Sequence, residues 1–259
     1  DNEILNSYNY GSYLYYQDAP TFVNNTYRTN SGYTGLIYGF NFGYCDNASL
    51  ITGNSAVIGP DNYGYGLYFN NCDGAAGAEG LVYNNMISIG NPSATSTSTG
   101  LYLTNSSRLN ISHNSFYIQS GGASSRGLYT TGGGLVTLTN NNFVLNGLGY
   151  AAYYNSQYTV SEADYNNYYT EGGSNFIFTS GGNVADIAAY QTASGQGTNS
   201  ISTDPMFQSF EDLHVCNDTL NGAGTPIAQV TVDIDGTPRD ASTPDIGADE
   251  FAPLTGDFL

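Results

Sequence analysis

Three aspartates recur at one position of a repeat, and carboxylates at such a spacing could bind a cation or serve in catalysis. Asp18, Asp46 and Asp73 are separated by 28 and 27 residues. If each repeat forms one turn of a stacked structure, their side chains lie about 4.8 Å apart, as neighbouring strands do. Calcium prefers such oxygen clusters, and two carboxylates about 5 Å apart suit a retaining glycosidase. The interpretation we favour is structural: each aspartate caps a turn.

Three tyrosines occupy a second shared position, two residues after a repeated glycine: Tyr68, Tyr102 and Tyr129. Stacked on the outside of a flat sheet, their rings could form a platform that binds the sugar rings of a glycan. Aromatic side chains also pack across neighbouring strands for stability alone, and each pair contributes about 0.2–1 kcal/mol. Both interpretations stay open at this point, with structural packing favoured.

Two cysteines, Cys45 and Cys72, are a third set of equivalent residues. Adjacent turns would place their Cα atoms inside the range of about 4.4–6.8 Å that a disulfide spans. An oxidising compartment would allow this bond. A column of buried thiols is the alternative, and Cys216 then has no cysteine partner.

The remaining candidates lie mostly in the acidic C-terminal part of the chain. His113 and His214 are framed by no Ser or Cys nucleophile motif, so we expect structural roles for both. Four further residues could hold calcium or form a buried ion-pair network that stabilises the fold: Asp233, Asp235, Arg239 and Asp245. We favour the stabilising network.

The elements that must position these residues are repeats of about 28 residues. Each copy has a glycine that opens an alternating apolar stretch, at positions 11, 39, 66, 100, 127 and 149. Each copy also has an asparagine between apolar residues: Asn25, Asn54, Asn85, Asn114, Asn141 and Asn166. Apolar residues alternate with period two after these anchors, which is typical of strands. One unit cannot bury such a face alone, whereas stacked units form a continuous core.

The repeat therefore predicts an all-β fold, a parallel β-helix (solenoid) of about six to seven rungs. We expect each anchor asparagine at a bend, because asparagine tolerates left-handed backbone. Its amide would hydrogen-bond to the equivalent amide one rung away. The rungs cover residues 1–171, and residues 172–259 form the last rungs and a cap. Residues 183–193 are predicted to form a short helix, capped by Asn183 or Asp186 and ended by Gly195. Because rung sequence begins at Ile4, we expect further rungs upstream in the natural protein.

The composition excludes several classes of partner. The chain has 259 residues, with four basic and 22 acidic ones and a net charge of −18. Nucleic-acid binding is excluded because no basic patch can displace counterions from phosphates, and attraction to anionic lipid is excluded for the same reason. No apolar run approaches the roughly 18–20 residues of a membrane span.

The C-terminal sequence resembles one family. The run from Gly181 to Phe207, followed by Asp233–Arg239 and Pro244–Phe251, is similar to the C-terminal end of secreted right-handed parallel β-helix proteins of Bacteroidetes and similar bacteria. These proteins resemble pectate lyases in fold. The resemblance implies export, a secreted or cell-surface location and a C-terminal cap, but no single activity.

Lyases of this fold usually use a Lys or Arg base, often with calcium, whereas this chain has no lysine and scattered arginines. We therefore expect a non-catalytic extracellular or cell-surface protein, a structural stalk or an adhesin, with weak contact to polysaccharides or surface glycans. No cofactor is expected, except for calcium at the aspartate column. The alternative is a carbohydrate-active enzyme, a polysaccharide lyase or glycoside hydrolase, or a fragment of one.

Overall fold

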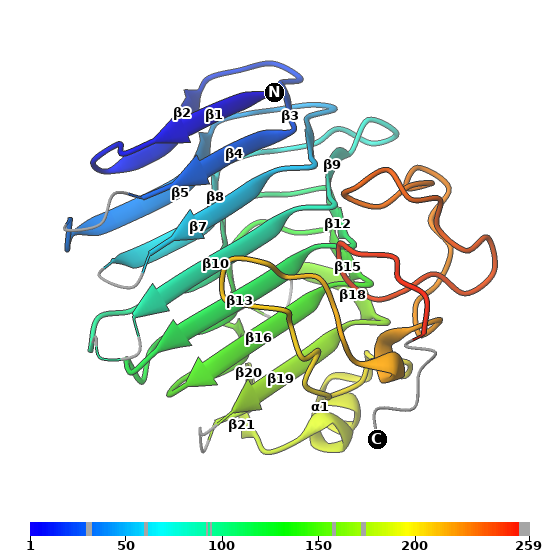
Figure 1. The fold of residues 1–259 in the computed structure, drawn as a ribbon. Helices are drawn as coiled ribbons and strands as arrows, with labels where there is room; N and C mark the ends of the chain where they lie inside the picture. The colour runs from blue at the N-terminus through cyan, green and yellow to red at the C-terminus, as the bar shows by residue number, and fades with distance from the viewer. Residues whose placement is uncertain are drawn as a thin grey trace.

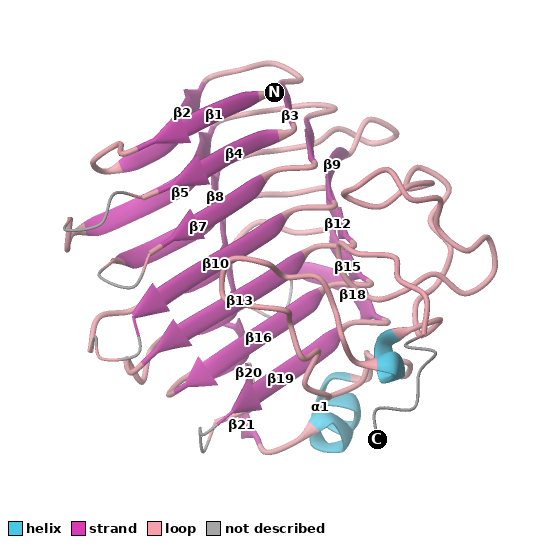
Figure 2. Cartoon of the chain, in the orientation of Figure 1, coloured by secondary structure: helices cyan, strands magenta, loops and turns pink. Residues whose placement is uncertain are grey.

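The computed structural model describes residues 1–29, 33–59, 62–91, 93, 95–156, 159–171 and 175–253. The chain forms a parallel β-solenoid of about six turns with one short α-helix, as Figures 1 and 2 show. Each turn contributes one strand to each of three sheets, which we call A, B and C. The predicted fold class is confirmed.

The strands of each sheet follow one another along the solenoid axis. Sheet A consists of β1 (Asn2–Leu5), β4 (Asn25–Arg28), β7 (Ser55–Ile58), β10 (Met86–Asn91), β13 (Ser115–Ser120), β16 (Asn142–Gly147) and β19 (Asn167–Glu171). Sheet B consists of β2 (Tyr10–Tyr15), β5 (Leu36–Gly43), β8 (Tyr63–Asn70), β11 (Thr99–Thr104), β14 (Arg126–Thr131), β17 (Tyr150–Tyr154), β20 (Ile177–Thr179) and the antiparallel β21 (Gly182–Val184). Sheet C consists of β3 (Thr21–Val23), β6 (Leu50–Thr52), β9 (Gly80–Tyr83), β12 (Leu109–Ser112), β15 (Val136–Thr139) and β18 (Val160–Asp164).

One continuous apolar core fills the inside of the solenoid. Equivalent inward residues stack from turn to turn, as the parallel rings of Phe116 and Phe143 do at a centroid distance of 5.4 Å. The stacking follows from the parallel, in-register pairing of the strands, which places Phe116 opposite Phe143. A single turn could not bury these side chains, so the core depends on the pile of turns.

The predicted asparagine column is confirmed at the corner between sheets C and A. Asn114 is fully buried, and its Nδ2 donates to Asn141 Oδ1 at 2.9 Å. The same amide-to-amide bond joins Asn85 to Asn114 at 2.8 Å and Asn141 to Asn166 at 2.9 Å. We call the six residues Asn25, Asn54, Asn85, Asn114, Asn141 and Asn166 the asparagine ladder.

The expected backbone conformation of the ladder residues is wrong by one position. The residue before each ladder asparagine adopts the left-handed conformation, as His113 (φ 50°) and Asn140 (φ 58°) do. The ladder asparagine itself follows this bend, and there its amide points inward and bonds to backbone carbonyls as well as to its neighbours. Its role is therefore hydrogen bonding rather than tolerance of left-handed backbone.

The glycines of the repeat lie where two turns approach closely in sheet B. A Cβ at Gly100 would lie 2.7 Å from the carbonyl oxygen of Gly127, and a Cβ at Gly127 would lie 2.5 Å from that of Ala151. The column therefore continues to Ala151, and our alignment of Gly149 with these glycines is wrong by two residues. The turn that follows Gly127 is shorter than the average repeat, so the sequence pattern placed the equivalent position at Gly149 instead of Ala151.

The C-terminal end of the solenoid is covered by α1 (Ile187–Ser194). Asp186 caps this helix by accepting a hydrogen bond from Ala189 N, and Gly195 ends it in the left-handed conformation. Asn183 belongs to β21 instead. Tyr190 of the helix packs against the rings of Tyr154 and Tyr168 in the last turns, at centroid distances of 5.8 and 5.6 Å. The helix thus closes the core, as a solenoid end requires.

The chain after residue 203, which we call the tail, does more than cap that end. It carries one 3-10 turn, η1 (Asp218–Leu220), and runs back along the outside of sheet A and the corner with sheet C (Figure 1). Its Glu211 forms an ion pair of 2.6 Å with Arg28 in the second strand of sheet A. Phe207 and Leu213 pack near Met86 and Tyr117 of the middle turns. The tail therefore joins distant turns to one another.

No helix among the described residues has the length and apolar character that crossing a membrane requires.

Candidate functional site

The three aspartates lie in one column at the corner between sheets B and C, with their side chains exposed. Asp46 Oδ1 accepts a hydrogen bond from Asp73 N at 3.1 Å, and Asp18 Oδ1 accepts one from Asn47 Nδ2. Each of these two carboxylates therefore bonds to the next turn, which agrees with turn capping. Calcium binding by Asp18, Asp46 and Asp73 stays a prediction.

Cys45 and Cys72 are free thiols in the structure, and a disulfide between them in an oxidising compartment stays a prediction. Both are buried, and Cys72 Sγ accepts a hydrogen bond from Cys45 N at 3.4 Å. In the next turn, Ser106 Oγ accepts from Cys72 N at 3.0 Å. The facing thiol of Cys45 and burial raise the pKa of Cys72. These side chains do at this corner what the asparagine ladder does at the other one, because a small polar group satisfies the next backbone N–H.

Tyr68, Tyr102 and Tyr129 lie side by side on the outer surface of sheet B, as predicted. The strands pair them in register, and their ring centroids are 4.9 and 4.8 Å apart. Tyr153 continues the column at 5.6 Å from Tyr129, and Phe178 follows at 4.2 Å from Tyr153. A row of aromatic rings thus runs along several turns of the solenoid.

A second tyrosine column, which the sequence analysis missed, lies beside the first. Tyr10, Tyr38 and Tyr65 stack at centroid distances of 5.0 and 4.9 Å. Tyr65 also contacts Tyr68 and Tyr102 edge to face. We call the two columns the tyrosine face: Tyr10, Tyr13, Tyr38, Tyr65, Tyr68, Tyr102, Tyr129, Tyr150 and Tyr153.

The rings of the tyrosine face pack on one another, and this determines what they present to solvent. Tyr68 and Tyr102 are nearly parallel, with 14° between their planes. Because stacked rings such as these cover part of each other's faces, the column presents less open ring face to a ligand than separate tyrosines would. Burial, together with the neighbouring phenols, raises the pKa of Tyr68 to about 12, and the pKa of Tyr102 is also raised, chiefly by burial. These hydroxyls are therefore neutral near pH 7 and can both donate and accept hydrogen bonds.

Arg126 is part of this face. Its guanidinium carbon lies 4.6 Å from the ring centroid of Tyr129 and 4.6 Å from that of Tyr153. Contacts of this kind attract the cation to the ring and are worth about 0.5–2 kcal/mol. Sequence reasoning treated Arg126 as one of four scattered arginines and did not place it beside Tyr129. The two residues lie three positions apart, so a strict period of two would put them on opposite sides.

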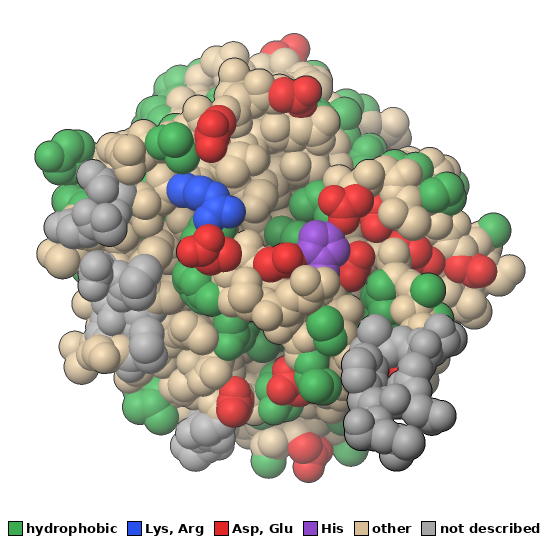
Figure 3. All heavy atoms as spheres, in the orientation of Figure 1, with side chains coloured by type: hydrophobic (Ala, Val, Ile, Leu, Met, Phe, Trp, Pro, Cys, Tyr) green, Lys and Arg blue, Asp and Glu red, His purple; other side chains and the backbone are tan. Residues whose placement is uncertain are grey.

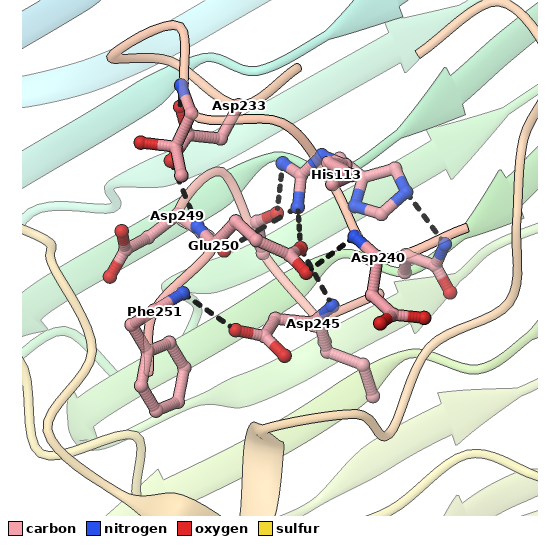
Figure 4. A network of polar contacts seen from close by, with 12 residues as sticks. His113, Asp233, Asp240, Asp245, Asp249, Glu250 and Phe251 are labelled. Atoms are coloured by element: carbon pink, nitrogen blue, oxygen red, sulfur yellow. Dashed lines mark hydrogen bonds and ion pairs between the residues drawn. The ribbon is translucent and has the colours of Figure 1, made fainter. Parts of the chain in front are cut away.

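Three of the four predicted tail residues, Asp233, Arg239 and Asp245, belong to a buried polar network that holds the tail against the solenoid (Figure 4). Arg239 donates through Nη2 to Asn84 Oδ1 at 2.9 Å and through Nη1 to Glu250 Oε2 at 3.1 Å. Asp233 accepts from Glu250 N at 3.0 Å, and Asp245 accepts from Phe251 N at 2.7 Å. Burial raises the pKa of Asp245 to about 6. These contacts join groups of the chain to one another, as expected of a network that stabilises the fold.

His113 belongs to the same contact between tail and solenoid (Figure 4). It is fully buried, and burial and the nearby Arg239 hold its pKa well below the usual value. Its ring is therefore neutral, and Asn140 Nδ2 lies 2.8 Å from Nε2, which accepts the hydrogen bond. Asn140 also holds the tail, by donating to Thr225 O at 2.7 Å.

His214 lies among carboxylates on the surface that the tail forms, and Figure 3 shows acidic side chains gathered around a partly exposed histidine. Its Nδ1 bonds to Asp212 and its Nε2 bonds to Asp235 at 2.6 Å. Burial alone would lower the pKa of His214, but the hydrogen bonds to Asp235 and Asp212 raise it to about 9. Asp235 therefore pairs with this imidazolium and stands apart from the contacts of Arg239.

A groove of about 210 Å³ lies between sheet A and the start of the tail. Two carboxylates line it, those of Glu171 at the end of β19 and Asp204 in the tail, beside the aromatic side chains of Tyr117, Tyr169 and Phe207. Asn146 Nδ2 donates to Glu171 Oε2 at 2.9 Å. Sequence reasoning missed this pair, because docking of the tail brings Asp204 onto sheet A, and Glu171 occupies a position that Gln119 and Asn146 fill in the preceding turns.

Searches with this sequence and structure find no matching family model, no matching curated protein and no matching solved structure.

Proposed function

We propose that this chain is a non-catalytic β-solenoid, secreted or displayed at the cell surface, that acts as a rigid stalk or adhesin and contacts glycans through the tyrosine face. By the resemblance of its C-terminal sequence, it is a right-handed, pectate-lyase-like β-helix protein of the Bacteroidetes type. One observation carries the functional proposal. Tyrosines stand in register on sheet B, while the tail packs along sheet A and its corner with sheet C.

The chemistry of this face suits a neutral polymer of sugars. It offers phenol hydroxyls at the regular spacing of the turns, and sugar hydroxyls donate and accept hydrogen bonds as phenols do. Tyrosine gives contact area at a low cost in side-chain entropy. Stacking has already fixed the rings, as in Tyr68 and Tyr102, so little further ordering is needed on binding.

Phenylalanine substitutions test the proposal without removing the ring stack. We expect the combined Tyr68→Phe, Tyr102→Phe and Tyr129→Phe variant to fold as the parent does and to lose binding to insoluble polysaccharides in a pull-down panel. Tyr83→Phe, on the outside of sheet C, is the matched control. Unchanged binding by the triple variant would refute the assignment of the tyrosine face.

The groove on sheet A favours the second candidate, a carbohydrate-active enzyme or part of one. A glycoside hydrolase needs two carboxyl groups, and Glu171 and Asp204 line this groove together. Burial raises the pKa of Tyr169 in the same groove, and the charges of Asp204 and Glu171 raise it further. If sugar release from a polysaccharide panel is detected and Glu171→Gln or Asp204→Asn abolishes it, the chain is a carbohydrate-active enzyme and the non-catalytic proposal is wrong.

A further inference from the structure

Arg126 differs from the two arginines that form ion pairs. Arg28 pairs with Glu211 at 2.6 Å, and Arg239 pairs with Glu250 at 3.1 Å. Within the described parts of the chain, no carboxylate lies within ion-pair distance of Arg126, and its buried Nε has no hydrogen-bond partner. A guanidinium has five N–H donors; since Nε is enclosed by protein, the four on the two Nη atoms are the donors that this side chain can offer to a ligand.

The tyrosines hold the guanidinium in place. Tyr129 and Tyr153 lie at equal distances of 4.6 Å from its carbon, and strand pairing sets Arg126 between Thr99 and Tyr150 of the neighbouring turns. Because the two ring centroids are themselves only 5.6 Å apart, both rings lie toward the same side of the guanidinium, and packing against them restricts its movement. A fixed planar fork of this kind matches the two oxygens of a carboxylate or the oxygens of a sulfate.

The surroundings of Arg126 are free of acidic residues along the strands. The first six strands of sheet B contain no Asp or Glu, although the whole chain has 22 acidic residues. Eleven of the 22 lie in the sequence from Asp204 onward. The tyrosine face therefore combines one cation with neutral hydroxyls, in a molecule whose net charge is −18.

We propose that the tyrosine face binds glycans in which isolated anionic groups, carboxylate or sulfate, occur among neutral sugars, and that Arg126 binds the anionic group. This inference rests on the proposed glycan contact and adds the class of glycan. The phenols bind the neutral sugars on either side. A continuous polyanion is disfavoured, because a charge of −18 repels it over the whole surface while only one cation on the face attracts it.

The experiment measures binding of the full chain to four glycans of equal length by isothermal titration calorimetry. They are a neutral oligosaccharide, the same one with a single carboxylate, the same one with a single sulfate, and a fully carboxylated one. We expect the singly charged glycans to bind on the order of tenfold or more tightly than the neutral one, as a charge-assisted hydrogen-bonded pair gives. The carboxylate and sulfate arms identify the anion.

Three variants connect the preference to the residue. The preference is the ratio of the affinities for the singly charged and the neutral glycan; Arg126→Gln is expected to abolish it, and Arg126→Lys to retain part of it. Arg108→Gln, at the corner after sheet B, is the matched control and keeps the full preference. If Arg126→Gln proves unfolded by circular dichroism, the comparison of glycans on the parent protein decides.

The outcomes separate the two proposals. Equal affinity for neutral and singly charged glycans, tightest binding of the fully carboxylated one, or a preference that survives in Arg126→Gln overturns the inference and leaves the proposed glycan contact standing. Binding of none of the glycans overturns both.

Discussion

Replacing Asn114 by alanine removes the centre of the asparagine ladder. Its Nδ2 donates to Val82 O, Ser112 O and Asn141 Oδ1 at 2.9–3.0 Å. Its Oδ1 accepts from both the backbone N and Nδ2 of Asn85, at 3.0 and 2.8 Å. No water reaches this side chain, which is fully buried. Each of these bonds would be lost without replacement.

The expected loss follows from the partners left unsatisfied. In the alanine variant, the N–H of Asn85 and the carbonyl of Val82 lose the partners that Asn114 provides at this corner. A buried group without a partner costs about 1–3 kcal/mol, so two such groups cost about 2–6 kcal/mol. Since whole domains are stable by about 5–15 kcal/mol, we expect a large fraction of the stability to disappear.

Equilibrium unfolding in urea, followed by circular dichroism, measures the effect. The matched control is Asn110→Ala in the same turn, because Asn110 is only partly buried and its Oδ1 accepts a single side-chain bond, from Thr137. We expect a loss of about 1 kcal/mol or less for this control, the ordinary contribution of one such bond. Equal losses in the two variants would refute the view that the ladder holds the turns together.

Three further predictions concern close approach, pH and the tail. Gly66→Ala should destabilise the solenoid by about 1–3 kcal/mol, measured by urea unfolding, because its Cβ would lie 2.6 Å from Gly100 O; an unchanged midpoint contradicts this. Burial lowers the pKa of His214, but the hydrogen bond to Asp235 outweighs it and raises the pKa to about 9. The folded-state pKa thus exceeds the unfolded value of about 6.5, so this stabilisation is complete below pH 6.5 and is lost as the pH rises through 9. His214→Gln should flatten the unfolding free energy over that range, by about 1–2 kcal/mol after solvent screening, and a slope equal to the parent's argues against it. Arg239→Met leaves buried acceptors of the tail unpaired and should cost about 3–5 kcal/mol; limited proteolysis should then cleave the tail first, whereas parental resistance would exclude this role.

The repeating part of the fold could be predicted because each turn has the same environment. Neighbouring turns contact only each other, so a residue type that suits one position recurs after about 28 residues. Asn114 and Asn141 could therefore be placed on top of one another from sequence alone, as could Tyr68 and Tyr102. The prediction failed where the copies differ in length, as at Gly149.

The second tyrosine column was missed for a local reason. Strict alternation would place Tyr65 and Tyr68 on opposite sides of β8, because they are three residues apart. Gly66 interrupts the alternation where the turns approach closely, so both rings lie outside and contact each other at 5.2 Å. The same offset brings Arg126 beside Tyr129. A repeated glycine two positions before an aromatic residue is thus a signal that the period has shifted.

The position of the tail could not be predicted, because its contacts depend on residues far apart in sequence. Asn84 and Arg239 are separated by 155 residues, and neither belongs to a motif that names the other. The acidic composition of the tail indicated its charge but not the surface of the solenoid on which it docks.

Docking of the tail gives the three sheets different roles. It brings carboxylates onto sheet A and the corner with sheet C, where Arg239 neutralises Glu250 and His214 pairs with Asp235. Sheet B then keeps a surface whose polar groups are phenols, amides and hydroxyls, with Arg126 as its cation. Since exposed charges more than about 10 Å apart are largely screened at 0.1 M salt, an anionic ligand at Arg126 experiences the local cation more strongly than the distant acidic tail. The preference for singly charged glycans should therefore increase when salt is raised from very low levels toward 0.1 M. If the glycans were bound only by attraction to a basic surface, the preference would decrease over the same range.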